Sequence, residues 1–296
     1  MNKFLSFLQA VMGIIYKKPL PELECNKLMP RGTYGVPRWA KSFTYYTFSG
    51  RAMAQFVEAN AKDLPPVAIT LGEVAKKLWD IGDSFSYGWR ELEGAANGGV
   101  NLSEAMGVEA RNGILNKIDD VAINGDALRG IDGFINNANV TTTTSAALLD
   151  ASAHTSGVPN TGDDWVALIR AIFNAFKATG YKPDTLAMPS NIAGKFSDGR
   201  MGANLETRIE EYVKKCFPTI KEIVYVDCLN GAGAGASDRI VAYTKSEDFL
   251  MNVVPVEFEM LDPQASGLGT TINCPAVTGG CCIFRPTGFL YVDLKS

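Results

Sequence analysis

Histidine is nearly absent from this sequence, and so are the patterns that usually carry catalysis. The 296 residues include a single histidine, His154, in the polar stretch "DASAHTSGVPNTG". Serine and cysteine hydrolases, histidine-ligated zinc sites and two-histidine iron sites mostly need at least one well-placed imidazole. Serine, glycine and proline at this density predict an exposed loop. We therefore expect His154 to be an ordinary loop residue and predict no catalytic residue.

Cysteine pairs with metal-ligand spacing are missing too. None of the six cysteines forms a C-x-x-C pair, so zinc ligation is disfavoured and we predict no metal or cofactor site. Two are adjacent, and neighbouring side chains of a strand point to opposite faces. We expect buried, reduced thiols. The six are Cys25, Cys216, Cys228, Cys274, Cys281 and Cys282.

An excess of positive charge is also lacking. Lys and Arg number 28 against 32 Asp and Glu, which gives a net charge of -4. A protein that binds nucleic acid without sequence preference needs a basic surplus to neutralise phosphates, so that class is disfavoured. A shell that only surrounds a genome needs none.

No apolar run in the sequence is long enough to span a membrane. The run from Phe4 to Ile15 is interrupted by Gln9 and lacks a cleavage site for a signal peptide. Its apolar residues follow helical spacing, so a short amphipathic helix that docks on another surface is expected. No other stretch approaches a membrane span, and no membrane partner is expected.

The first half of the chain predicts an arm, a projecting loop and a long helix. Residues 16–40 hold four prolines and little periodicity, which indicates an extended arm that buries little surface unless it lies on another body. Aromatic and β-branched residues predict strands at 42–48 and 67–71, joined by a projecting, hairpin-like connection. Residues 101–124 carry one apolar stripe, and Gly125 is a natural stop for that helix.

The second half alternates helices and strands behind a polar connection at 140–162. Helices are expected at 164–179, 190–196 and 205–217. Strands are expected at 184–189, 222–229, 239–244, 253–260, 281–284 and 288–294. This alternation predicts a compact α+β unit with a mixed sheet.

Gly231, Gly233 and Gly235 have the spacing of a phosphate-binding loop. A dinucleotide fingerprint must open a helix whose N-terminus receives the phosphates. Here "RIVAYT" follows, which is strand-like, and there is no P-loop Lys-Ser/Thr. A flexible hairpin tip is the better interpretation.

Paired acidic residues have equally simple explanations. Asp119-Asp120 falls on the polar side of the long helix, and Asp163-Asp164 falls at a helix start, where negative charge is favourable. Glu210 and Lys214 are spaced for a salt bridge on a solvated helix face. None of these groups combines a nucleophile, a base and an orienting residue.

Four ordered motifs carry a family resemblance. They are "FSYGWRELEGAANGGVNL" before the long helix, "GIDGFIN" after it, "PDTLAMPSNIAGKF", and the closing "TGGCCIFRPTGFLYVD". The matching positions are Trp89 to Leu92, Gly130 to Asn136, Pro183 to Pro189 and Gly279 to Pro286. With this order, the chain beyond about residue 40 resembles the major capsid proteins of tailed bacteriophages of the Hong Kong 97 type.

The resemblance implies a domain layout for the α+β chain. Residues 1–40 would be the N-terminal arm. Residues 41–149 would be a peripheral domain, with an extended loop at about 48–72 and a spine helix at about 101–124. Residues 150–260 would be the axial domain, and 261–296 would return to the peripheral domain. The run ending in Arg285-Pro286 suits an edge strand that completes a sheet begun far upstream.

The resemblance also implies a function and partners. The chain would be a non-enzymatic subunit that assembles with itself into pentamers and hexamers of an icosahedral head, enclosing double-stranded DNA without sequence-specific binding. Scaffolding, portal and decoration proteins would be further partners, with synthesis in the host cytoplasm and residence in the virion. Some related capsids carry a lysine–asparagine cross-link; Lys62 lies in the candidate loop, but no such chemistry is predicted.

Two alternatives remain open from the sequence. An encapsulin-like nanocompartment would share the fold but load protein cargo. A nucleotide-dependent enzyme would use the loop that contains Gly231 and Gly235, and would bind nucleotide saturably.

Overall fold

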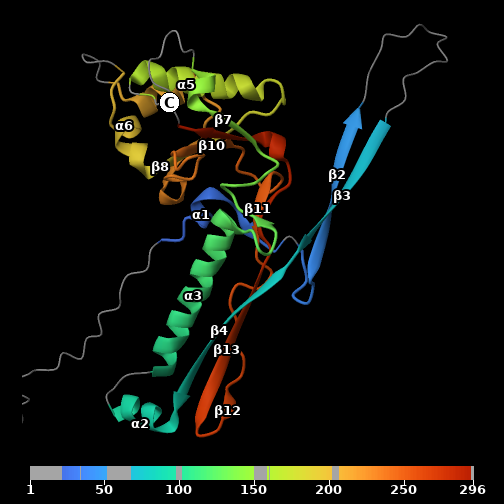
Figure 1. Ribbon diagram of the computed structural model, residues 1–296, viewed down its shortest axis with the longest axis vertical. Coiled ribbons are helices and arrows are strands. Elements are labelled where there is room, and N and C mark those ends of the chain that lie inside the picture. The colour runs from blue at the N-terminus through green and yellow to red at the C-terminus, as the bar shows by residue number, and fades with distance from the viewer. Residues whose placement is uncertain are drawn as a thin grey trace, which may run out of the picture.

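The computed structural model describes residues 22–33, 35–51, 68–97, 102–149, 159, 161–201 and 207–294. They form an elongated molecule with three parts (Figure 1). A helix-covered sheet makes the body, a long helix beside long strands makes the limb, and a two-stranded ribbon projects where the two meet.

Helices and strands alternate irregularly along the chain. The helices are α1 (Cys25–Leu28), α2 (Trp89–Asn97), α3 (Leu102–Asn124), α4 (Ser145–Leu148), α5 (Gly162–Phe176), α6 (Ala193–Ser197) and α7 (Ile209–Cys216), with 3-10 turns η1 (Ser190–Ile192), η2 (Asp227–Leu229) and η3 (Pro286–Gly288). The strands are β1 (Arg31–Gly32), β2 (Ser42–Arg51), β3 (Ala68–Lys77), β4 (Trp79–Gly88), β5 (Gly125–Asp126), β6 (Ile131–Asp132), β7 (Thr141–Thr144), β8 (Thr185–Pro189), β9 (Glu222–Val226), β10 (Arg239–Tyr243), β11 (Leu250–Val253), β12 (Gln264–Ser266), β13 (Gly269–Thr278), β14 (Gly280–Ile283) and β15 (Phe289–Asp293).

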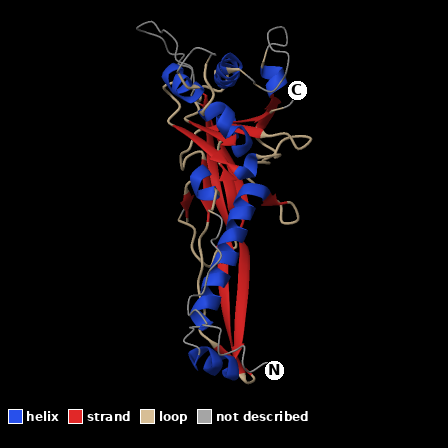
Figure 2. Ribbon diagram, turned by 90° about the vertical axis from the view of Figure 1, so that its left-hand side faces the viewer, coloured by secondary structure: helices blue, strands red, loops and turns tan. Residues whose placement is uncertain are grey.

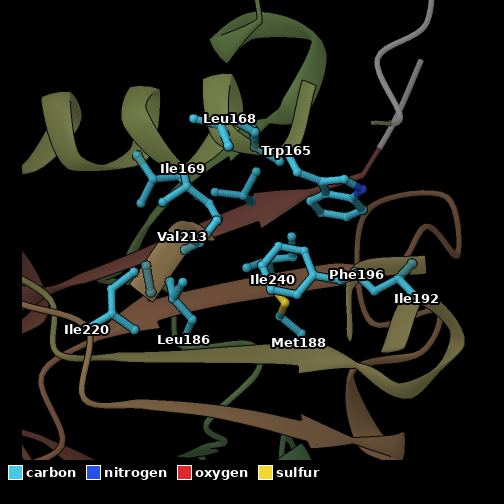
Figure 3. Packing of buried hydrophobic residues seen from close by; sticks show 14 of the residues in the cluster. Trp165, Leu168, Ile169, Leu186, Met188, Ile192, Phe196, Val213, Ile220 and Ile240 are labelled. Atoms are coloured by element: carbon cyan, nitrogen blue, oxygen red, sulfur yellow. The ribbon is translucent and has the colours of Figure 1, made fainter. Parts of the chain in front are cut away.

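The body is built on a five-stranded mixed sheet in the order β7-β15-β10-β8-β9. The α5 helix begins at a capping box formed by Thr161 and Asp164, and its apolar stripe faces the sheet. Figure 3 shows the side chains of α5 and α6 directed toward those of the sheet strands. The cluster includes Trp165, Leu168, Ile169, Leu186, Met188, Phe196 and Ile240.

The opposite face of this sheet is buried as well. Its side chains, such as Ala187 and Val241, pack with the C-terminal end of α3 and with α1. Because β8, β10 and β15 are covered on both faces, every residue in them is buried. This explains why these strands are nearly continuous apolar runs without alternation.

The limb consists of α3 lying along the antiparallel pair β4–β13 (Figure 2). Ala110, Ile114 and Ile118 pack against Ile272 and Cys274. A helix of 23 residues rises about 34 Å, and a ten-residue strand spans about the same length. Helix and strands therefore cover each other over nearly their full lengths.

A small sheet in the order β1-β11-β14 joins the limb to the body. Strand β1 is parallel to β11, and β14 pairs antiparallel on its other side. The predicted edge strand that completes a sheet begun far upstream is thus confirmed. The adjacent Cys281 and Cys282 lie in different apolar clusters, as predicted for neighbours on a strand.

Several elements follow the sequence-based expectations. The helix predicted at 101–124 is α3, and the one at 164–179 is α5, which ends earlier, at Phe176. The strand at 184–189 and the short helix after it are also present. The third helix is shorter than predicted, since α7 begins at Ile209.

Other expectations were wrong or incomplete. The long strands β4 and β13 and the helix α2 were not predicted. The strand expected at 253–260 ends at Val253, because Pro255 cannot continue a ladder, and only an isolated bridge at Val256 follows. The strand expected at 222–229 ends at Val226 and continues as η2.

The segment 261–296 contributes strands to both the limb and the body. Strands β12 and β13 do pair with β4 in the limb. Strand β15, however, lies between β7 and β10 in the sheet of the body. The C-terminal segment therefore ties limb and body together.

Gly125 ends α3 for a steric reason. Its φ is 71°, a left-handed conformation, and a Cβ there would come 2.4 Å from the Ile131 carbonyl oxygen. Gly130, in the same short hairpin, also has a positive φ of 66°, but nothing lies within 4 Å of its Cβ position.

These two glycines make a matched pair of substitutions. We expect Gly130→Ala to lower the free energy of unfolding of the unassembled subunit by about 1 kcal/mol, the cost of the left-handed backbone. Gly125→Ala should cost about 1–3 kcal/mol more, because the methyl group also overlaps backbone atoms. Urea unfolding followed by circular dichroism measures both. Equal losses would contradict the steric explanation.

Candidate assembly surfaces

The ribbon exposes one apolar face. Strands β2 and β3 pair antiparallel over ten register pairs, from Ser42↔Lys77 to Arg51↔Ala68. Directly opposed residues share a face, so alternate positions of both strands line one side. On that side Tyr46 is 63% exposed, Phe48 74%, Ile69 64% and Leu71 62%. We call these four side chains the ribbon face.

The base of the ribbon is held on its other side. Phe43 is buried in a cluster with Leu78, and the Tyr45 ring meets Phe284 edge-on with centroids 4.9 Å apart. A Cβ at Gly279 would lie 3.0 Å from Leu78 Cδ2, so a side chain there would crowd this junction. The ribbon is therefore fixed at its base while its apolar face is open to solvent.

The predicted projecting loop at 48–72 is thus the outer part of this hairpin. Its strands are longer than expected, because β2 continues to Arg51 and β3 runs from Ala68 to Lys77. Residues 52–67, including Lys62, lie outside the described residues, as do His154 and the helix expected at 4–15.

The segment 22–33 packs on its own chain, which corrects part of the arm prediction. Cys25, Leu28 and Met29 are buried in the same cluster as the sheet of the body. The Tyr243 hydroxyl donates to the Leu28 carbonyl oxygen at 2.5 Å. The backbone N–H of Asn252 donates to the Pro30 carbonyl oxygen at 2.9 Å. Prolines and weak periodicity hid three apolar anchors in the sequence, and residues 22–33 are part of the folded subunit.

A second apolar surface caps the far end of the limb. Trp89, at the start of α2, donates its backbone N–H to the Leu268 carbonyl oxygen at 3.3 Å. Leu268 is 82% exposed, at the turn between β12 and β13. The Arg90 guanidinium lies over the Trp89 ring at 5.1 Å. Like the ribbon face, this surface places large apolar groups in water.

The glycine-rich loop is not a hairpin tip, contrary to expectation. Strands β9 and β10, which flank it, do not pair, because β8 lies between them. The backbone N–H of Ala234 donates to Asp293 at 3.0 Å, and that of Gly231 donates to Asp238 at 2.9 Å. Carboxylates of the chain thus occupy N–H groups that a phosphate would use, and β10 follows directly. This geometry favours a structural role.

Asp293 is also half of a buried ion pair. Its carboxylate accepts hydrogen bonds from Arg239 Nε at 2.6 Å and Nη2 at 3.1 Å. The Arg239 guanidinium also donates to the Ile135 carbonyl oxygen and lies over the Tyr291 ring at 4.9 Å. The pair therefore joins β10, β15, the glycine-rich loop and the segment after β6.

The acidic pairs seen in the sequence have structural partners. Asp119 accepts the backbone N–H of Cys25 at 2.9 Å, Asp164 belongs to the cap of α5, and Lys214 pairs with Glu210 at 2.7 Å. Among residues 22–294, in the ranges that the structure describes, no group of three potential ligands is placed to hold a metal ion. No described helix is long and apolar enough to cross a membrane.

The cysteines are unpaired, and four are buried: Cys25, Cys274, Cys281 and Cys282. Burial raises the pKa of Cys25 to about 11 and that of Cys282 to about 12. Cys228 is half-buried, and burial with a hydrogen bond to Glu24 raises its pKa. Cys216 differs from the expected burial, because it lies exposed at the end of α7.

Loss of the buried ion pair should be costly. Arg239→Leu leaves Asp293 charged and buried without its partner, so we expect a loss of about 3–5 kcal/mol in the free energy of unfolding. Lys214→Leu breaks an exposed pair and should cost at most about 1 kcal/mol. Chemical unfolding of the unassembled subunits compares the two. Similar losses would show that the Arg239–Asp293 pair does not hold the body together.

Thiol labelling tests the burial pattern. With an aromatic disulfide reagent at pH 8, we expect one fast-reacting thiol per native unassembled subunit, Cys216, because thiolates react and the others are covered or have raised pKa values. All six cysteines of the sequence should react after denaturation. A Cys216→Ser variant should lack the fast phase; retention of that phase would contradict the assignment.

The fold is similar to that of several solved capsid structures. The structure from "The capsid of Myoviridae Phage XM1" superposes with a TM-score of 0.75 at 15% identity, covering 97% of both chains. "Capsid of native GTA particle computed with C5 symmetry" gives a TM-score of 0.65 at 12% identity, covering 100% of this chain and 98% of that one. "Crystal structure of virus-like particle from Pyrococcus furiosus" gives 0.54 at 14% identity, covering 90% and 91%. At these identities the likeness shows the fold.

The family follows from the sequence match. Residues 52–294 match the family model described as "Major capsid protein". The chain belongs to the major capsid protein family, and it is a structural protein of a capsid shell. Its place is therefore the virion. A comparison with curated proteins gives no match.

Proposed function

We propose that this chain assembles into pentamers and hexamers that close an icosahedral phage head around double-stranded DNA. The observation that carries the proposal is the ribbon face, a set of large apolar side chains on a two-stranded hairpin. Such a hairpin is marginal alone and needs a partner surface. Covering the face would contribute about 1.5–3 kcal/mol for each fully buried side chain.

The direction of the ribbon supports ring formation. It projects to one side of the junction between body and limb, so its partner surface lies elsewhere on the neighbouring subunit (Figure 1). Contacts between two different surfaces are heterologous, and they generate closed rings when the rotation closes. Modest contacts that are repeated around each subunit then sum to a stable particle.

The proposed domain layout keeps the expected boundaries with three adjustments. Residues 41–149 form the peripheral domain, including the ribbon and α3, except that β7 pairs with β15 in the sheet of the body, and residues 150–260 form the axial domain. The segment 22–33 joins the folded subunit, which leaves 1–21 as the arm. The return segment 261–296 serves both domains, since β13 pairs with β4 and β15 pairs with β10.

Other partners are proposed from the family relationship. A head shell fills through a portal, and its assembly is guided by scaffolding and completed by decoration proteins. The net charge of -4 suits a wall that encloses DNA without binding its sequence. Synthesis would take place in the host cytoplasm, and no reaction is assigned to the chain.

An encapsulin-like compartment is the second candidate, because the fold is also similar to that of a virus-like particle from Pyrococcus furiosus, although with a lower TM-score than to the phage XM1 capsid. The two are distinguished by particle content. A phage head expressed with its phage genes packages DNA, whereas a nanocompartment retains a protein cargo.

The ribbon face gives the sharpest test. We expect the purified wild-type chain, expressed with its scaffold, to form shells visible by electron microscopy. Phe48→Asp with Leu71→Asp should remain folded but lose at least about tenfold in particle yield, because two charges would have to be buried at the contact.

A matched control lies on the same strand. Thr70 is exposed on the opposite side of the ribbon from Leu71, so Thr70→Asp should assemble like wild type. Persistent monomers or dimers of the wild-type chain would refute the proposed function. Normal shells from the Phe48/Leu71 variant would refute the role of the ribbon face.

A further inference from the structure

Two grooves of opposite charge flank the C-terminal half of α3. The first, the acidic groove, has a volume of about 700 Å³ and lies between the segment 22–27, α3 and η2. Five carboxylates line it against one lysine, Lys27. They are Glu22, Glu24, Asp119, Asp120 and Asp227.

Like charges in the acidic groove are held close by the fold. Glu24 accepts the backbone N–H groups of Asp227 at 2.8 Å and Cys228 at 2.9 Å, which fixes it across the groove from α3. Burial raises the pKa of Asp119, and the Glu24 and Asp120 carboxylates add to the rise. At the rim, the Glu22 side chain is 80% exposed and pairs with Lys27, and the Asp120 side chain is 47% exposed and pairs with Lys117 at 2.7 Å. Both pairs are solvent-exposed, and Glu24, Asp119 and Asp227 leave the groove with an excess of carboxylates.

The second, the basic groove, lies between β3, the start of β4 and the turn 129–132, with a volume of about 370 Å³. Lys76, Lys77 and Arg129 line it against one carboxylate, Asp132. Lys76 lies 3.5 Å from Asp132, and the Arg129 guanidinium lies over the Trp79 ring at 5.9 Å while pairing with Asp126. Lys77 is exposed and has no ion-pair partner within the described ranges.

The two grooves open on different sides of the molecule. In Figure 1, α1 and the segment leading to it lie on one side of the C-terminal end of α3, whereas β3 lies on the other. The basic groove is on the side from which the ribbon projects, because β3 belongs to both. The acidic groove therefore opens on one side of the C-terminal end of α3, and the basic groove opens on the other.

We propose that the basic groove of one subunit faces the acidic groove of a second copy within the ring. This proposal rests on the proposed function and describes the electrostatic part of the contact between subunits. A ring of identical subunits needs two different surfaces that fit each other, and opposite charge on opposite sides supplies this complementarity. Because the basic groove continues into the base of the ribbon, the same neighbour meets the ribbon face. The charged contact sets the position of one subunit relative to the next, and the apolar contact supplies most of the buried area.

Charge reversal and its rescue test the contact. One variant carries Lys77→Glu and Arg129→Glu, and a second carries Glu22→Lys and Asp120→Lys. Each replaces attraction with repulsion at every contact of the ring. We expect each to raise the protein concentration needed for assembly by about tenfold or more, as for a loss of about 1.4 kcal/mol. The variant with all four changes should recover to within about threefold of wild type, since the contact is again attractive.

The matched control for the Lys77/Arg129 variant is Lys214→Glu with Lys215→Glu on α7, which makes the same change in net charge away from both grooves. It should assemble like wild type, and circular dichroism establishes that each variant is folded. Assembly of either reversal variant at the wild-type concentration would overturn the proposal. An equal assembly defect in the control would also overturn it, and so would failure of the variant with all four changes to recover assembly. Wild-type shells accompanied by any of these results would leave the proposed function intact, whereas absence of wild-type shells would refute the function itself.

Discussion

Leu78 lies at the point on which the whole arrangement depends. It is the single residue between β3 and β4, so one nearly continuous strand runs from the ribbon into the limb and changes its partner from β2 to β13 there. Its side chain is buried with Phe43, Met251, Val253 and Cys282, and its backbone N–H donates to the Lys41 carbonyl oxygen at 2.9 Å. Strands β11 and β14 also contribute to this cluster. The ribbon, the limb and the small β1-β11-β14 sheet therefore share one anchor. The direction in which the ribbon leaves the subunit is fixed by that anchor.

A second anchor, inside the body, has a different character. The apolar junction at Leu78 works by close packing, and Gly279 leaves room for it. The Arg239–Asp293 pair instead gathers β10, β15 and the glycine-rich loop by directed hydrogen bonds. Buried pairs of this kind add little net stability over an apolar core, but they permit few alternative arrangements. Both anchors leave the apolar ribbon face uncovered. The fold of the subunit is therefore complete, but it exposes an apolar surface that a neighbouring subunit can cover.

The sequence predicted the elements that are governed by local pattern. The α3 and α5 helices carry apolar stripes with clear stops, and the hairpin strands are rich in aromatic and β-branched residues. The ordered motifs indicated the family, which the match over residues 52–294 confirmed. The cytoplasmic setting, the absence of a catalytic residue and the further partners stay predictions.

What the sequence did not predict depends on long-range pairing. Strand β4 reads "WDIGDSFSYG", where small and polar residues weaken the strand pattern, and it is stable because ten residues of β13 pair with it from nearly two hundred positions away. The docking of 22–33 rests on three apolar side chains among prolines, and their partners are scattered over α3, β10 and β11. The ribbon face could have been found from the alternation of Tyr46 with Phe48 and of Ile69 with Leu71. That these side chains are exposed could not have been predicted, because their exposure depends on which surfaces the rest of the chain leaves uncovered.

The charge distribution follows the same logic at the level of assembly. Neither groove is visible in the sequence, because the five carboxylates of the acidic groove come from three separate segments. Repulsion among them costs stability in the isolated subunit, yet the fold holds Glu24 and Asp119 in place with backbone N–H groups. A group of like charges is tolerable in a subunit if a neighbour neutralises it, and exposed charges separated by more than about 8 Å are screened at physiological salt. Such a contact therefore acts only at close range, after the apolar ribbon face has brought two subunits together, and it favours the one register in which opposite charges meet.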